Sequence, residues 1–152
     1  MFRTVSYHRH LVLIIVVVVI ASTVGYYLAS PLFISQSVSE KPPEASSQVL
    51  VVGTFAGADS FHRTSGTAKI IQLDNGSRIL RLESFTVTNG PDLYVYLSAD
   101  QQAQDYVSLG RLKGNTGDQN YGLAVSADLS RYKYVLIFCQ AFRVLFGSAL
   151  LA

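Results

Sequence analysis

Beyond the N-terminal segment, two side chains have the types that redox or metal chemistry needs, the thiol of Cys139 and the imidazole of His62. Cys139 is the only cysteine of the chain, and it lies in the apolar run from Tyr134 to Phe142. In an exported domain, a single cysteine is a packed core residue, half of an intermolecular disulfide, or a reactive or ligand-binding thiol. The residues alone leave these alternatives open.

His62 lies in a turn-rich segment, residues 59–66. It is either a loop histidine bonded to backbone, or an axial ligand or acid/base group that the fold brings near Cys139. Cysteine and histidine can together ligate a transition metal. Two ligands fall short of the three or four that zinc usually takes, so we expect no metal site of that kind.

Other familiar chemistries have little support in the sequence. The segment from Gly110 to Tyr121 is rich in glycine, but it lacks the order of a phosphate-binding loop and no helix follows it, so we expect no nucleotide. Residues 49–152 carry nine basic and eight acidic side chains with the signs interspersed, which does not favour a nucleic-acid surface. No serine–histidine–aspartate or paired-carboxylate motif supports a hydrolase.

The N-terminal segment is typical of a membrane span. Leu11 to Ala29 contains 19 residues without a charge, about 28 Å of helix, close to the thickness of a hydrocarbon core. Arg3 and Arg9 precede it and the next basic residue is Lys41, which places residues 1–10 in the cytoplasm and the rest outside. A cleaved signal peptide is the alternative, and it exports the same domain.

After the predicted transmembrane helix 11–29, residues 30–48 have the composition of a linker, with Pro42-Pro43 and several serines. Residues 49–152 are enough for one small extracytoplasmic domain. Short runs of β-forming residues alternate there with Gly, Asn and Asp turns. We predict an all-β fold, a β-sandwich or compact barrel of about eight mostly antiparallel strands. The expected strands are Val49–Thr54, Gly66–Leu73, Ser77–Leu82, Leu93–Ser98, Tyr106–Arg111, Tyr121–Val125, Lys133–Cys139 and Phe142–Leu150.

The two-residue period of a strand assigns a face to Cys139. Val135, Ile137 and Cys139 share one face, and Tyr134, Leu136 and Phe138 share the other. Both faces are apolar, so we expect a central strand with little solvent on either side. Burial would make the thiol unreactive unless a positive group or a metal stabilised the thiolate.

Blocks of residues across the predicted domain follow the pattern of a known family. They are Gly53-Thr54-Phe55 with Asp59, His62 and Ser65-Gly66; Leu82 and Phe85; Asn89-Gly90-Pro91-Asp92-Leu93 with Leu97-Ser98; Leu109 to Asn115 with Gly117 to Tyr121; and Cys139 with Phe142, Val144, Phe146 and Gly147-Ser148-Ala149. This pattern resembles the DM13 domain and covers nearly all of residues 49–150.

The resemblance implies a β-rich extracellular module, found alone behind a membrane anchor in microbes and beside DOMON-type domains in animals. It further implies that Cys139 is redox-active, as a free thiol or as a ligand of haem, with His62 a weaker candidate ligand. The predicted function is therefore redox or electron transfer by a single-pass membrane protein that exchanges electrons with a separate redox protein. The alternative is a non-catalytic surface module for binding or adhesion, with Cys139 only packed in the core.

Overall fold

The computed structural model describes residues 3–33, 35–43 and 47–152, and the chain divides into two compact units at residue 34. The first contains one helix, α1 (Arg3–Phe33), and the second contains every strand of the described residues. The all-β prediction with one N-terminal apolar helix is confirmed, with nine strands rather than about eight. They are β1 (Ser37–Ser39), β2 (Ser47–Gly57), β3 (Thr64–Leu73), β4 (Arg78–Val87), β5 (Leu93–Ser98), β6 (Tyr106–Arg111), β7 (Thr116–Leu123), β8 (Tyr134–Cys139) and β9 (Val144–Leu150).

Helix α1 is apolar on all sides over most of its length. Its stretch from His8 to Tyr27 is long and apolar enough to cross a membrane, and every side chain of that stretch is exposed. The hydroxyl of Thr23 donates to the Val19 carbonyl at 2.8 Å, so its polar group is satisfied within the helix. Such a helix could be a membrane span or a signal sequence.

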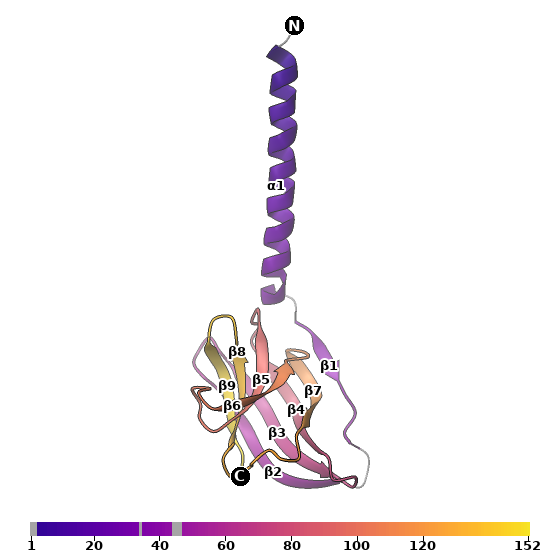
Figure 1. The fold of residues 1–152 in the computed structure, drawn as a ribbon, viewed down its shortest axis with the longest axis vertical. Helices are drawn as coiled ribbons and strands as arrows, with labels where there is room; N and C mark the ends of the chain where they lie inside the picture. Colours follow the sequence, from indigo (N-terminus) through magenta and orange to yellow (C-terminus); the bar gives the residue numbers. More distant parts are fainter. Residues whose placement is uncertain (1–2, 34, 44–46) are drawn as a thin grey trace. The chain divides into compact units, whose positions relative to one another are not determined.

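The strands form one curled sheet in the order β1-β7-β4-β3-β2-β9-β8-β5-β6, and its curvature makes a half-barrel (Figure 1). Within the described residues only β1 and β7 pair in parallel. Strands β5 and β6 coincide with the predicted ranges. The prediction for Tyr121–Val125 was wrong in its bounds, because β7 begins at Thr116 inside the glycine-rich segment.

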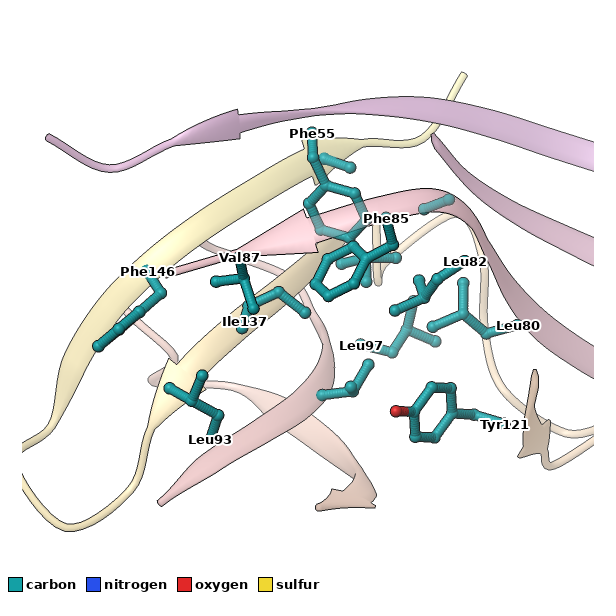
Figure 2. Packing of buried hydrophobic residues seen from close by; sticks show 14 of the residues in the cluster. Phe55, Leu80, Leu82, Phe85, Val87, Leu93, Leu97, Tyr121, Ile137 and Phe146 are labelled. Carbon is teal, nitrogen blue, oxygen red and sulfur yellow. The ribbon is translucent and has the colours of Figure 1, made fainter. Parts of the chain in front are cut away.

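Side chains from both halves of the sheet fill the inside of the half-barrel. Phe55 of β2 and Phe85 of β4 meet edge to face there, with ring centroids 5.3 Å apart (Figure 2). Val87, Ile137 and Leu97 join the same inner cluster from three further positions in the sheet (Figure 2). A smaller outer cluster packs on the other face of β5 and β8, around Tyr96, Leu136 and Phe138.

Strand β1 lies in the segment that the sequence predicts as a linker, and of that segment residues 34 and 44–46 lie outside the described residues. Its backbone pairs with Thr116–Asp118 of β7. The guanidinium of Arg81, only 2% exposed, donates to the carbonyls of Glu40 and Lys41 at 3.2 Å each. A polar segment without hydrophobic period is therefore held by partners that are distant in sequence.

Arg81 also meets groups of β4 and β7. It forms ion pairs with Glu83 at 2.9 Å and Asp118 at 2.7 Å, and it donates to Asn120 Oδ1 at 2.9 Å. Glu40 completes the network, since it accepts from the Lys113 ammonium at 2.7 Å and from the Asn120 amide at 2.6 Å. A buried charge with this many partners is satisfied, and losing them would leave it unpaired in the protein interior.

Gly117 gives a test of the β1 contact. Its φ of 101° is unfavourable for other residues, and a Cβ there would overlap the carbonyl oxygen of Val38. We expect Gly117→Ala to lower the free energy of unfolding by about 2 kcal/mol or more. Gly122→Ala in the same strand meets open space and should change it by less than about 0.5 kcal/mol. Denaturant unfolding of both variants measures this, and equal stabilities would contradict the close packing of β1.

Candidate functional site

Cys139 is the last residue of β8, a strand that lies between β5 and β9. Its Cα partners are Leu93 of β5 and Val144 of β9. The assignment of faces is confirmed, because Cys139 belongs to the inner cluster with Val135 and Ile137. The residue is 1% exposed, while Gln140 directly after it is exposed and begins the turn to β9. The thiol is thus buried, but it lies at an end of the sheet.

The surroundings of Cys139 do not fit a haem. The inner cluster around it consists of packed aliphatic and aromatic side chains. Protein interiors have few voids larger than a water molecule, and a haem macrocycle is far larger than one side chain. Iron could approach the sulfur only if core side chains such as Leu93 and Val144 moved away. The chemistry open to Cys139 in this arrangement is that of a buried free thiol.

His62 is held in a short turn between β2 and β3. Its Nδ1 lies 2.7 Å from Asp59 Oδ2, and the other oxygen of Asp59 accepts from the backbone amides of Phe61 and His62 at 2.7 Å each. The imidazole packs edge to face on Phe146 of β9, with ring centroids 4.4 Å apart. The side chain is partly exposed, so its ring is positioned at the surface.

His62 and Cys139 are connected only through the inner cluster, and they do not contact each other in any interaction of the described residues. Phe146, which carries the His62 ring, belongs to the inner cluster that contains Cys139. Among the described residues no hydrogen bond joins the two candidates, and no three His, Cys, Asp or Glu side chains gather as metal ligands. The role of His62 as a ligand stays a prediction from the sequence.

The comparisons decide which family these elements belong to. The family model described as "Electron transfer DM13" matches residues 54–151, well over half of the chain. The chain belongs to the DM13 family. Neither the curated proteins nor the solved structures gave a match. The DM13 match begins inside β2 and contains both Cys139 and His62, whereas α1, β1 and Glu40 precede it.

The glycine-rich block of the DM13 domain holds its own loop together. Gln119 is fully buried, and its side-chain oxygen accepts from the Lys113 and Gly114 amides and from the Tyr121 hydroxyl, the last at 2.7 Å. Its amide donates to the Gly114 carbonyl at 2.8 Å. Burial raises the pKa of Tyr121 to about 12, so the hydroxyl stays protonated as a donor. These contacts give the block a structural role.

The DM13 domain also has an aromatic cluster that the sequence did not single out as a unit. On the outer face of the sheet, Tyr96 stacks on Tyr106 with ring centroids 4.1 Å apart and tilts against Phe138 at 5.6 Å. Burial, and then the neighbouring Tyr106, raises the pKa of Tyr96 to about 12. In the sequence, the alternating tyrosines Tyr94 and Tyr96 are the pattern that could have indicated this cluster. The cluster lies on the face of β8 opposite to that of the Cys139 side chain.

A cleft of about 380 Å³ opens where β3 begins and β4 ends. Its lining residues are Arg63, Thr64, Ser65, Thr86, Val87 and Thr88. The Thr88 hydroxyl is buried without a hydrogen-bond partner, whereas that of Thr64 donates to the Phe146 carbonyl at 2.8 Å. The lining contains hydroxyls and one guanidinium and no carboxylate, which favours a negatively charged or neutral polar group over a cation.

The Asp59–His62 turn gives a prediction for acid titration. Hydrogen bonds from the His62 side chain, then from the His62 and Phe61 backbone, lower the pKa of Asp59 from 3.8 to about 2. Ionised Asp59 therefore stabilises the folded chain above pH 4, and this contribution is lost as the pH falls through about 2. The carboxyl carbon shift of Asp59, followed by NMR, should have its midpoint near pH 2.

The matched variant is Asp59→Asn, which removes the titrating group and keeps the shape of the side chain. The stability difference between the original chain and this variant should shrink between pH 4 and pH 2. A carboxyl midpoint near 3.8 would show that the turn is not formed in solution.

Proposed function

We propose that this chain is a membrane-anchored, extracytoplasmic electron-transfer domain in which Cys139 exchanges electrons with a separate redox protein. The observation that carries the proposal is the position of the single thiol. It lies inside the part of the chain matched by an electron-transfer family, one residue before an exposed turn. A partner docked on that turn would come close to the sulfur without unfolding the sheet.

The proposed chemistry needs only the thiol and a partner with a redox metal centre. In one direction the Cys139 thiol gives one electron to the oxidised metal centre and one proton to water, leaving a thiyl radical. In the other direction the sulfur takes up one electron from a reduced donor and one proton from water. The apolar inner cluster would protect the radical from side reactions, while the proton passes to and from water at the exposed turn that follows Cys139.

The anchor in this proposal is α1, with Leu11–Ala29 across the bilayer and residues 1–10 in the cytoplasm. The apolar stretch of α1 and its exposure on all sides support a membrane-spanning role. The basic residues Arg3 and Arg9 precede the stretch, which favours a cytoplasmic N-terminus. The electron partner would then meet the domain outside the cytoplasm.

A second candidate function is favoured by the burial of Cys139. With 1% exposure and apolar neighbours, the residue has the surroundings of a small packed hydrophobe. In that case the domain is a non-catalytic surface module for binding or adhesion.

Electrochemistry of the full chain in lipid nanodiscs distinguishes the two functions. Protein-film voltammetry should give a reversible wave for the original chain, and Cys139→Ala should lose it. Val135→Ala is the matched control, because Val135 is buried on the same face of β8 and its truncation also opens a small cavity. This control should keep the wave despite a comparable loss of stability.

The binding-module function predicts the opposite result in the same experiment. If neither the original chain nor Cys139→Ala gives a wave, and the thiol resists alkylation until denaturant unfolds the chain, the binding module is the function. Absorption spectra after incubation with haem complete the test. A Soret band that Cys139→Ala loses would overturn the thiol mechanism and show that the core opens for haem.

A further inference from the structure

We propose that one end of the sheet docks on an anionic lipid bilayer through Phe61 and Phe142, with Arg63 and Arg143 binding headgroup phosphates. The bilayer to which this end of the sheet binds is the one that α1 crosses, so this inference rests on the proposed anchor. It concerns the orientation of the domain, and with it the redox partner of the proposed function would have to reach the turn after Cys139 at the membrane surface.

The strand register brings four connections to the same end of the sheet, here called the proximal end. They are residues 58–63, 88–92, 112–115 and 140–143. Gly57 pairs with Gly147, Thr64 with Val87, and Leu93 with Cys139, so these connections follow or precede neighbouring strand ends. Figure 1 shows the turn between β8 and β9 at this end of the sheet and the C-terminus at the other.

The chain enters the sheet at the proximal end. Ser35 donates through its hydroxyl to Asn89 Oδ1 at 3.2 Å, and the carbonyl of Gln36 accepts from the Asn115 amide at 2.8 Å. Asn89 and Asn115 belong to two of the four connections. Ser35 follows Phe33, the last residue of α1, by two residues, which span at most about 7 Å.

The apolar stretch of α1 ends six residues before Phe33, a rise of about 9 Å along the helix. Both lengths are short beside a hydrocarbon core of about 30 Å. If α1 spans the membrane, its linkage therefore keeps Ser35, and with it the proximal end, near the bilayer surface.

Two phenylalanines are exposed at the proximal end. Phe61 is 82% exposed and Phe142 is 70% exposed, the highest values among the large hydrophobic residues of the sheet unit. The backbone of the turn that carries Phe61 is held in place, because the Phe61 amide donates to Asp59 and the Ala58 amide donates to the His62 carbonyl at 2.9 Å. Exposed aromatic side chains on a rigid turn are suited to insertion at a membrane interface.

The charges of the proximal end fit an anionic surface. Arg63 and Arg143 are exposed and form no ion pair with any residue in the described ranges. The acidic groups of this end are engaged, Asp59 by His62 and Asp92 by Arg111 at 2.5 Å. Basic residues near a membrane surface are attracted to anionic lipids.

The opposite end of the sheet has a different charge. Asp74 and Asp128 are exposed there, in the connections that follow β3 and β7. Neither forms an ion pair among the described residues, and the exposed Lys133 at the same end forms none either. The connections of that end carry four aspartates (Asp74, Asp100, Asp105 and Asp128) against two basic residues (Arg131 and Lys133). The contrast favours the proximal end as the lipid-facing one. The cleft beside Arg63 adds hydroxyls of Ser65 and Thr86 that can donate to a headgroup phosphate.

The chain contains no tryptophan, so a single introduced indole reports its own surroundings. The full chain carrying Phe61→Trp, Phe142→Trp or the control Val125→Trp is reconstituted into vesicles of phosphatidylcholine mixed with phosphatidylglycerol. Val125 is exposed and lies beyond the far end of β7, so the control offers the same side chain at the opposite end. Brominated lipids then quench whichever indole contacts the bilayer.

We expect the two proximal indoles to shift their emission to shorter wavelength and to lose most of it to the bromines, while the control keeps its emission. Replacing Arg63 and Arg143 by glutamine in the Phe61→Trp chain should reduce the quenching in the mixed vesicles and leave it unchanged in pure phosphatidylcholine. Equal quenching at all three positions, or none at the proximal positions, overturns the docking.

Flotation of the same vesicles separates this inference from the anchor on which it rests. A chain that floats with the lipid but has unquenched proximal indoles keeps the anchor and overturns the docking. A chain that stays in the aqueous fraction overturns the anchor, and the docking falls with it.

Discussion

Strand β2 joins the two halves of the half-barrel, and the position of every candidate residue depends on it. Its residues up to Thr54 pair with β3, and from Phe55 onward it pairs with β9. The change of partner occurs beside Gly53, where a Cβ would overlap the backbone oxygen of Leu150. Only a residue without a side chain lets β9 approach there. This approach brings Phe146 beneath His62 and sets β8 next to β9.

The pairing of β9 with β2 and β8 also determines the environment of the Cys139 thiol. Since β8 is covered on one face by the inner cluster and on the other by aromatic side chains, the sulfur is separated from solvent by packing rather than by a flexible lid. A buried thiol of this kind is protected from oxidation by small oxidants in solution. Electron transfer from it would therefore depend on a partner that recognises the turn beyond β8, and selectivity would come from docking.

The sequence predicted the elements whose stabilisation is local. Strand β5 was correct to the residue because alternating side chains follow the Asn89–Asp92 turn, and the faces of β8 followed from its period of two. Strand β1 was missed because Ser37–Ser39 has no hydrophobic period and depends on Arg81 and Gly117, which are distant in the chain. The spatial relation between His62 and Cys139 also depends on sheet register, which no single segment specifies.

The network around Arg81 has a consequence for how this domain could be released from a cell surface. A protease that cut between Lys41 and Ser47 would separate β1, Glu40 and Lys41 from the part that contains the family match. The released fragment would keep Arg81 but lose the Glu40 and Lys41 carbonyls that accept its hydrogen bonds. Shedding at that position would thus yield a weakened domain, whereas a cut ahead of Ser35 would leave its fold complete.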